Sequence, residues 1–414
     1  MVDPKVKYQT IEGFGGAFTE SDALVFYQLP PDKRAEILRA YFDPEHGHGY
    51  VLCRTTIGSA DFHVGNYSYD EVPGDVELKR FTIDHDRKAL IPFILEAMKT
   101  APQPLKLFAS PCSPPPWMKT NGKMTGGGKL KSEYRAAWAH YYTRYIHEYA
   151  KAGVPIWGLT VQNEPEAIQR WDSCELSGEE ERDFVRDYLG PELRKENLGS
   201  VKLMIWDHNR DRIYERAKVV LDDPNAAQYV WGTAFHWYVG DFFNNVQLVH
   251  DAYPDKQLLF SEGCQEGFDP KQLDSWAIGE RYGRSMLNDL NRWTVGWVDW
   301  NLVLDETGGP DLAKNFCFAP IIADTKSKEL KYLNSYYYIG HFARFIRPGA
   351  RRIIAASTRD ELQTTAFLNE DGRISAVVLN LSDSDIPFAL KYNGRAAMSS
   401  SPAHSILTFR FSAN

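Results

Sequence analysis

The sequence predicts an α/β fold, a (β/α)8 TIM barrel joined to a small antiparallel β-sandwich side domain. Short apolar, β-branched segments alternate eight times with segments of helical periodicity before about residue 301. After about Arg347 this pattern gives way to short alternating strands, separated by turn sequences such as Asn393-Gly394. The length of 414 residues also suits one barrel of about 250 to 300 residues with a small second domain.

Each barrel strand is expected where a buried, apolar run meets a polar or turn residue. The eight strands are predicted at residues 11–18, 50–58, 105–110, 157–164, 201–206, 229–238, 257–262 and 297–301. Three glycines in the first of them, Gly13, Gly15 and Gly16, suit close packing of the backbone. The helices, where apolar residues recur at helical spacing, are predicted at residues 32–41, 86–101, 133–152, 178–195, 210–221, 241–252 and 271–291.

The strands of the side domain come from both ends of the chain. They are predicted at residues 5–9, 364–368, 374–379, 388–390 and 405–411. The boundaries that follow are 10–345 for the catalytic barrel and 1–9 plus 346–414 for the β-sandwich.

The charge, hydropathy and cysteine content of the chain exclude several kinds of binding partner and site. The net charge of −8 argues against nucleic acid or an anionic membrane as the main partner, because both bind basic surfaces. The sequence has no run of about 18 apolar residues, so stable membrane insertion is not expected. The five cysteines lie far apart without a C-x-x-C pair, which argues against a disulfide framework or a zinc site.

The cellular compartment stays open, as does the oligomeric state. The segment Met1–Lys5 lacks the apolar core of a signal peptide. The location is cytoplasmic if Met1 is the native start, and secreted or periplasmic if a signal peptide has been removed.

Two glutamates end predicted barrel strands, Glu164 the fourth and Glu262 the seventh. Residues at the carboxyl ends of barrel strands line the active-site mouth, so both carboxylates are expected to face one cleft. Retaining sugar hydrolysis requires such a pair, an acid/base and a nucleophile about 5 to 5.5 Å apart. We assign the acid/base to Glu164 and the nucleophile to Glu262. The alternative is that both are solvated loop carboxylates.

The residues around this pair suit the same chemistry. Asn163 could donate to a sugar 2-hydroxyl, or be a turn amide. His236 and Tyr238 end the sixth strand beside Glu262, where they could hydrogen-bond the carboxylate or the sugar; His236 could also be a core histidine. Arg54 lies early enough in the second strand to point into the barrel, where it would stabilise a carboxylate or form a structural ion pair.

Three further residues are candidates for sugar binding. Asp61 follows the second strand and could accept hydrogen bonds from sugar hydroxyls, or cap a turn. Trp300 ends the eighth strand and could stack on a sugar, or belong to the core. Trp117 lies in a proline-rich exit from the third strand that would hold it as a rigid platform. Glu166 lies beyond Pro165 and is expected to stay outside the barrel rim.

Several stretches resemble family 30 of the glycoside hydrolases, in particular its glucosylceramidase-like members. They occur in the family's order and are residues 11–16, 109–111, 116–122, 163–165, 236–238, 261–264, 296–301 and 308–310. The resemblance implies a (β/α)8 barrel with a β-sandwich, retention of configuration, and no metal or other cofactor. It makes Glu164 the acid/base and Glu262 the nucleophile. It implies glycone contacts from Asp61, Trp117, Asn163, Trp300 and Asn315.

The expected activity is that of a retaining, exo-acting β-glucosidase on a small-molecule or oligosaccharide β-glycoside. A β-xylosidase or a β-1,6-glucanase on the same machinery is the alternative, and a non-catalytic carbohydrate-binding protein is a third. The sequence departs from the family in its short N-terminal side-domain segment and in several mouth loops. The departures leave the aglycone open, so neither a lipid substrate nor an activator protein is implied.

Overall fold

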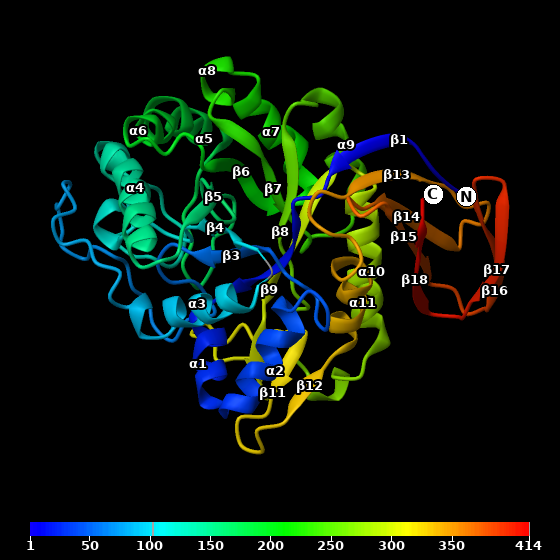
Figure 1. Ribbon diagram of the computed structural model, residues 1–414. Coiled ribbons are helices and arrows are strands. Elements are labelled where there is room, and N and C mark those ends of the chain that lie inside the picture. The colour runs from blue at the N-terminus through cyan, green and yellow to red at the C-terminus, as the bar shows by residue number, and fades with distance from the viewer. Residues whose placement is uncertain (102, 414) are drawn as a thin grey trace.

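The computed structural model describes residues 1–101 and 103–413. It confirms the predicted fold class: a closed parallel barrel lies beside a second body built from a seven-stranded sheet (Figure 1). Both ends of the chain lie in that second body. In the described part of the chain, no helix is long and apolar enough to cross a membrane.

Over the described residues, eight parallel strands close the barrel in sequence order. They are β2 (Gly13–Phe18), β3 (Leu52–Thr56), β4 (Lys106–Ser110), β5 (Ile156–Thr160), β6 (Lys202–Asn209), β7 (Val230–His236), β8 (Gln257–Glu262) and β9 (Thr294–Asn301). Each overlaps a strand predicted from the sequence. Several boundaries differ by a few residues, and one of them matters for the site: β5 ends at Thr160, so Asn163 and Glu164 belong to the loop that follows it.

The interior of the barrel is a packed core. Leu52, Phe108, Met204, Leu259 and Val298 come from different strands and are fully buried in one cluster, as layered barrel interiors require. The first strand approaches its neighbour closely, because a Cβ built on Gly15 would lie 1.6 Å from the carbonyl oxygen of Leu52. This contact confirms the predicted role of the glycines in close backbone packing.

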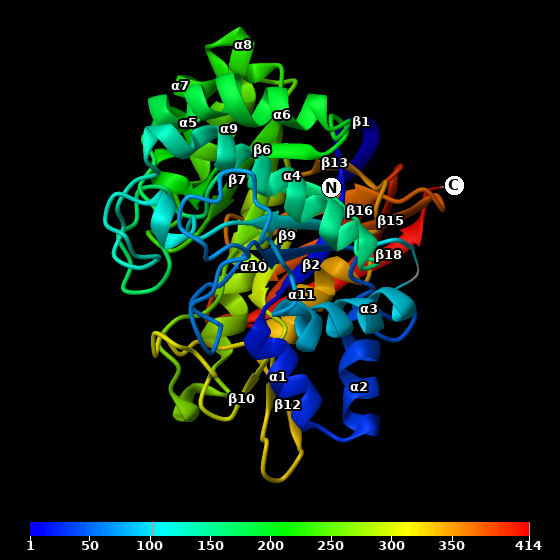
Figure 2. The same cartoon turned by 90° about the vertical axis from the view of Figure 1, so that its left-hand side faces the viewer.

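The α-helices surround the barrel (Figure 2). They are α1 (Glu20–Gln28), α2 (Pro31–Phe42), α3 (Leu90–Thr100), α4 (Arg135–Lys151), α5 (Gly178–Phe184), α6 (Gly190–Lys195), α7 (Ile213–Leu221), α8 (Pro224–Ala227), α9 (Phe243–Ala252), α10 (Trp276–Leu290) and α11 (Asn334–Ala343). A π-helical segment, Val185–Leu189, joins α5 to α6. Short 3-10 turns lie at Asp86–Lys88, Pro116–Met118, Ser132–Tyr134, Arg210–Arg212 and Pro270–Gln272.

Three helices and a small sheet of this layer were not expected from the sequence. Helices α1, α8 and α11 were missed, as was a small sheet of β10 (Val303–Asp305), β11 (Ile321–Ala323) and β12 (Leu330–Tyr332). Helix α1 buries polar as well as apolar residues and therefore lacks a clear amphipathic pattern. Its capping box, in which Thr19 and Asp22 exchange hydrogen bonds, was the signal available.

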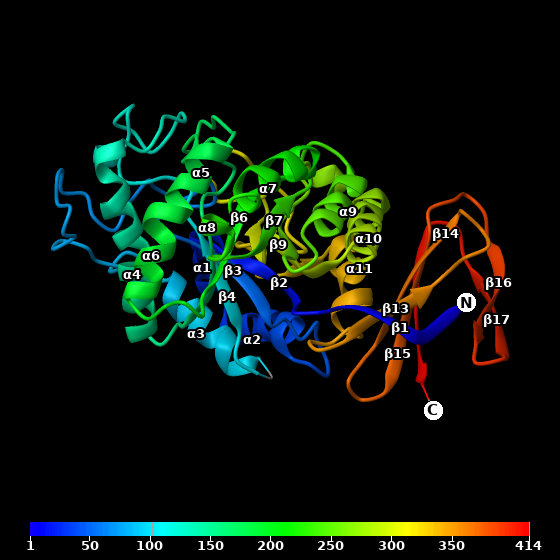
Figure 3. The ribbon, with the colours of Figure 1, turned by 90° about the horizontal axis from the view of Figure 1, so that it is seen from above.

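The side domain is built on a sheet with the strand order β17-β16-β1-β13-β14-β15-β18 (Figure 3). Its strands are β1 (Val2–Thr10), β13 (Arg351–Ala355), β14 (Leu362–Leu368), β15 (Arg373–Asn380), β16 (Ile386–Tyr392), β17 (Arg395–Ser401) and β18 (Ser405–Ser412). The sheet is not purely antiparallel, because β1 meets β16 in parallel at Val2 and Tyr392. We propose the domain boundaries expected above, 10–345 and 1–9 plus 346–414.

Candidate active site

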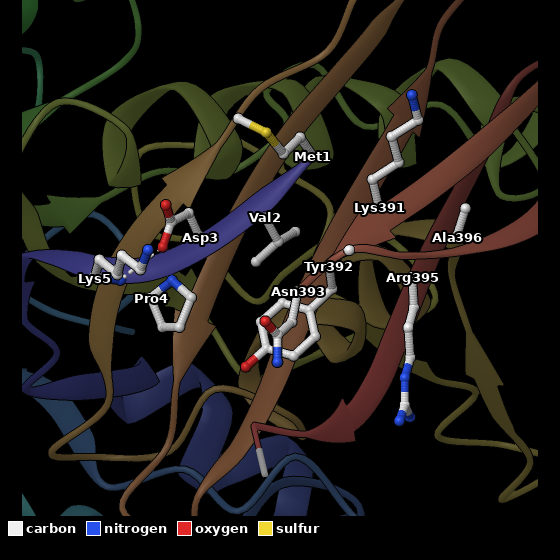
Figure 4. A pocket seen from close by; sticks show the side chains of 11 residues that line it. Met1, Val2, Asp3, Pro4, Lys5, Lys391, Tyr392, Asn393, Arg395 and Ala396 are labelled. Atoms are coloured by element: carbon white, nitrogen blue, oxygen red, sulfur yellow. Dashed lines mark hydrogen bonds between the residues drawn. The ribbon is translucent and has the colours of Figure 1, made fainter.

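A cavity of about 210 Å³ opens at the carboxyl ends of the barrel strands. A larger one, of about 610 Å³, lies in the side domain between β1 and the β16–β17 hairpin (Figure 4). Among the described residues that line the larger cavity, Asp3 supplies the single carboxylate, whereas the smaller cavity contains both predicted glutamates. Because paired carboxylates carry the expected chemistry, the barrel cavity is the candidate active site.

The loop after β5 carries Glu164 into this cavity. The backbone N–H of Asn163 donates to the carbonyl of Pro111 at 2.9 Å, and that of Glu164 to the carbonyl of Asp207 at 3.0 Å. Glu164 has a φ of +46°, a left-handed conformation that is uncommon for a residue with a side chain. Such strain is held by surrounding structure and clusters at functional sites.

The two glutamates and His236 converge. A carboxylate oxygen of Glu164, one of Glu262 and a ring nitrogen of His236 lie within 4.8 Å of one another. The spacing is close to the roughly 5 to 5.5 Å of retaining glycosidases and below the roughly 6.5 to 9.5 Å of inverting ones. The same atoms could contact a metal ion, but the guanidinium of Arg54 already places a positive charge on Glu262, which disfavours a second cation there.

Glu262 is held by two donors. Arg54 Nη1 donates to Oε2 at 2.8 Å, and the hydroxyl of Tyr238 donates to Oε1 at 2.8 Å. Burial raises the pKa of Glu262 above its ordinary value, although the charges of His236 and Arg54 act in the opposite direction. Arg54 itself is fully buried and points into the barrel, as the sequence predicted.

Glu164 contacts the imidazole of His236. Nδ1 lies 3.4 Å from Glu164 Oε1 and 3.8 Å from Glu262 Oε1. Burial disfavours charge on both groups, but their mutual contact lowers the pKa of Glu164 to about 2. Glu262, Asp207 and Glu164 together raise the pKa of His236 to about 9. At neutral pH the free site therefore carries a proton on His236, between the two glutamates.

Asp207 connects these groups and was not singled out from the sequence. Oδ1 accepts from His236 Nε2 at 2.9 Å, and Oδ2 accepts from Arg54 Nη2 at 3.0 Å and from the Thr160 hydroxyl at 2.7 Å. Burial opposes its charge, but Arg54 and His236 hold the pKa of Asp207 below its ordinary value. The available signal was its place directly after the predicted fifth strand, which ended at Trp206.

A bulge in β6 directs this carboxylate inward. Trp206 and Asp207 both have a positive φ, +73° and +51°, and the pairing with β7 shifts register between Trp206 and His208. The extra residue turns neighbouring side chains in different directions. Asp207 is therefore buried beneath the glutamates, while His208 lines the cavity.

Most of the predicted sugar-binding residues reach the cavity. Those that line it with the two glutamates are Asp61, Asn163, Tyr238, Trp300 and Asn315. Asn315 Nδ2 donates to Asp61 Oδ2 at 3.3 Å. Arg54 lies beneath Trp300, with 5.2 Å between its Cζ atom and the ring centroid.

Trp117 lies elsewhere. Its indole N–H donates to the carbonyl of Asp70 at 2.9 Å, and its ring meets Tyr134 edge to face. It borders a separate cavity of about 460 Å³ together with Asn66 and Met124. The structure therefore does not bring Trp117 into the cavity of the two glutamates.

The remaining lining residues were missed from the sequence. They are Gln169, Trp171, His208, Asn209, Glu266 and the three cysteines Cys112, Cys264 and Cys317. They lie on loops or strand ends, whose course hydrophobic periodicity does not encode. Gln169 Nε2 donates to Glu164 Oε2 at 3.3 Å, which places the segment 165–171 beside the proposed acid/base.

A closed barrel that presents two buried carboxylates in one cavity, at the carboxyl ends of its strands, has the arrangement that glycoside hydrolysis requires. The comparisons agree: the Glycosyl hydrolase family 30 TIM-barrel domain matches residues 11–346, and the Glycosyl hydrolase family 30 beta sandwich domain matches residues 349–409. The chain belongs to family 30 of the glycoside hydrolases.

Three relatives illustrate the range of similarity. The chain is 36% identical to lysosomal acid glucosylceramidase of Mus musculus over 99% of its own length and 82% of that protein. The crystal structure of SrfJ from Salmonella typhimurium superposes with a TM-score of 0.96 at 37% identity, covering 100% of this chain and 92% of that one. The endo-β1,6-glucanase BT3312 has a TM-score of 0.90 at 28% identity, covering 99% and 94%.

Proposed function

We propose that the protein is a retaining, exo-acting β-glycosidase that hydrolyses β-glucosides by double displacement. The observation that carries the proposal is the approach of Glu164 and Glu262, together with His236, to within 4.8 Å in one cavity. In a retaining enzyme the nucleophile bonds directly to the anomeric carbon, so the two carboxylates lie close together. In an inverting enzyme a water molecule must fit beside the sugar, and the carboxylates lie farther apart.

In the first step Glu262 attacks the anomeric carbon while Glu164 gives a proton to the departing oxygen. Arg54 and Tyr238 hold Glu262 for attack. The negative charge of Glu262 helps to keep a proton on His236. As that charge is consumed in the new bond, the affinity of His236 for its proton falls, and the proton passes across the 3.4 Å contact to Glu164.

In the second step these changes reverse. Glu164 removes a proton from a water molecule, which attacks the anomeric carbon and frees Glu262. The returning charge on Glu262 again favours a proton on His236, and Asp207, hydrogen-bonded to Nε2, stabilises the imidazolium that forms again. Asn163 accepts from Arg54 at 2.7 Å and thereby keeps its amide N–H groups free for the sugar.

The size of the cavity supports exo action. Its volume of about 210 Å³ is below the roughly 300 to 1,000 Å³ of pockets for drug-sized ligands. It suits one sugar ring, with Asp61 and Asn315 as polar contacts and Trp300 as an apolar face. Both glutamates are in place with charged partners, which disfavours a non-catalytic binding protein. No contact in the cavity favours a β-xylosidase over a β-glucosidase.

The second candidate is a β-1,6-glucanase or another enzyme whose leaving group is a sugar. It is favoured by the side of the cavity nearest Glu164, where Gln169, Trp171 and His208 combine amide, indole and imidazole groups. An aromatic face beside polar groups suits a second sugar ring better than an alkyl chain. The similarity to an endo-β1,6-glucanase points the same way.

The test is the pair of variants Glu262→Gln and Glu166→Gln, assayed on aryl β-glucoside, β-xyloside, β-galactoside and β-fucoside and on β-1,6-linked glucose oligomers. Glu262→Gln should lower kcat by more than about 10³-fold, because a nucleophile is lost. Glu166 is the matched control, since it pairs with Arg212 and Arg216 outside the cavity. The first product released should be the β-anomer by NMR.

The assignment of Glu262 fails if Glu262→Gln keeps more than about a tenth of the wild-type rate. Release of the α-anomer would exclude retention. Wild-type hydrolysis of internal bonds in the oligomers, without hydrolysis of aryl glycosides, would replace exo action with the second candidate.

A further inference from the structure

Three of the five cysteines, Cys112, Cys264 and Cys317, line the active-site cavity. All cysteines in the described part of the chain are free thiols. The proposed mechanism uses none of the three. Thiols in a sugar-binding wall contribute little to hydrogen bonding, because sulfur is a weak donor and acceptor.

Two of these thiols adjoin each other. Both line the same cavity, their segments are joined by the bridge between Glu266 and Cys317, and each thiol shifts the pKa of the other. Cys317 Sγ donates to the carbonyl of Asn315 at 3.2 Å, and the Tyr238 hydroxyl lies 3.7 Å from Cys264 Sγ. The thiol pair therefore lies between a residue that holds Glu262 and a residue of the proposed sugar pocket.

The backbone fixes the pair in place. Cys264 lies two residues after Glu262, and Cys317 lies in the segment that follows Asn315. The two segments form a bridge between Glu266 and Cys317, and the N–H of Phe318 donates to the carbonyl of Gln265 at 2.9 Å. Two sulfur ligands are thus held at one point of the cavity wall.

Two neutral thiols side by side react with a different class of reagent than a single thiolate does. The neighbouring Cys317 thiol and burial raise the pKa of Cys264 well above its ordinary value. The Cys264 thiol acts to lower the pKa of Cys317, but burial and nearby carboxylates raise it overall. Thiolate-dependent alkylation and oxidation are therefore slow at neutral pH. Trivalent arsenic reacts by exchange instead: As(OH)₃ and two S–H groups give (RS)₂AsOH and two waters, with no change of oxidation state. Thiols are also the ligands that soft ions prefer.

We propose that Cys264 and Cys317 form a dithiol site in the active-site wall that binds trivalent arsenic, and that the bound arsenic blocks the sugar pocket. The arsenic would replace the contact between the two thiols and place its remaining hydroxyl beside Tyr238 and Asn315. Formation of the adduct does not depend on the proposed function. The block of activity rests on the proposed function.

The experiment incubates the reduced full-length protein with sodium arsenite and measures two quantities: the intact mass and the hydrolysis of the aryl β-glycoside that the wild type accepts. Wild type should gain one arsenic per chain and lose activity. An added dithiol, 2,3-dimercaptopropanol, should reverse both changes, whereas a monothiol at the same concentration should not. A glycone bound in the cavity should slow the reaction.

The variants identify the site. Cys264→Ala and Cys317→Ala should each need at least about a hundredfold more arsenite, because the second sulfur binds intramolecularly. Cys112→Ala, a single thiol of the same cavity, and Cys174→Ala, a buried thiol outside it, should bind arsenic like the wild type. Circular dichroism checks that each variant is folded, and Cys264→Ser and Cys317→Ser replace any that is not.

A wild-type protein that gains no arsenic, or a Cys264/Cys317 double variant that gains as much as the wild type, would overturn the site. One arsenic per chain with undiminished hydrolysis would overturn the block of the sugar pocket while leaving the adduct in place. If the wild type hydrolyses no glycoside, the proposed function fails, and the mass measurement still decides the dithiol site.

Discussion

At the scale of single residues, the carboxylate of Asp207 links the groups that control the two glutamates. It binds Arg54, which holds Glu262, and His236, which contacts Glu164. Its side chain is completely buried between these cations. A buried charge with hydrogen-bonded partners on both sides is stabilised by them and fixes them in turn. Asp207 is thus a positioning residue, and its effect should be visible in the pH dependence of the reaction.

We expect kcat/KM to follow a bell-shaped pH profile, which reports the free enzyme. The rate should rise with pH as Glu262 loses its proton, at a pH above the ordinary glutamate pKa of about 4.3, because burial raises the pKa of Glu262. It should fall as His236 loses the proton destined for Glu164, near its pKa of about 9. Rates on an aryl β-glycoside between about pH 4 and pH 10 measure both limbs.

The variant Asp207→Asn tests the origin of the alkaline limb. Without the negative charge the pKa of His236 falls, so the alkaline limb should move to lower pH by about one unit or more. Asp222→Asn is the control, since Asp222 lies on the surface beside Lys218. An alkaline limb that stays in place in a folded Asp207→Asn protein would remove His236 as the proton source.

At the scale of secondary-structure elements, the barrel strands could be predicted because each is an apolar run with a polar end. Glu262 ends β8, as expected. The loops were harder, because their course depends on contacts between distant segments. Asn163 and Glu164 lie beyond β5 and are positioned by Pro111 and Asp207, and the bulge in β6 has no signature in hydrophobic spacing.

The resemblance to family 30 supplied what periodicity could not. It identified Asn315, which lies in a loop and donates to Asp61 across the cavity. It also implied a sugar contact from Trp117, which in this structure borders a different cavity. A sequence motif shared with a family predicts which residue type occurs at a position. The position of the side chain in space also depends on the conformation of the surrounding loops. The mouth loops are the part of this chain that departs from the family.

The close approach of β2 to β3 depends on a glycine. Gly15→Ala should lower the free energy of unfolding by at least about 3 kcal/mol, because the added Cβ would meet the carbonyl oxygen of Leu52 at 1.6 Å and backbone cannot move aside as a side chain can. Gly199→Ala is the matched control, with no heavy atom near the added Cβ. Urea unfolding followed by tryptophan fluorescence measures both. Equal stabilities of the two variants would contradict this account of the contact between β2 and β3.

At the scale of the whole molecule, the chain leaves the side domain after β1, builds the barrel and returns to the side domain from β13 onward. Side chains connect the two bodies along α10 and α11. Asn291 Nδ2 donates to the carbonyl of Thr364 at 3.0 Å, and the Thr408 hydroxyl donates to the carbonyl of His341 at 2.9 Å. Contacts of this kind couple the unfolding of one body to that of the other.

The strand that begins the chain offers a test of this coupling. Val2 is 5% exposed and packs in the side-domain core with Ile353 and Ile374, whereas Val6, on the same strand, is 46% exposed. Val2→Asp buries an unpaired carboxylate and should lower the free energy of unfolding by about 3 kcal/mol, while Val6→Asp should change it by less than about 0.5 kcal/mol. Two temperatures are compared for Val2→Asp and the wild type: the temperature at which glycosidase activity is lost, and the midpoint of thermal unfolding measured by circular dichroism. If the two bodies unfold together, Val2→Asp should lower both temperatures by the same amount. The opposite outcome is that Val2→Asp loses part of its circular dichroism signal at a temperature where it still hydrolyses glycosides at the wild-type rate. This outcome would show that the barrel is stable without a folded side domain.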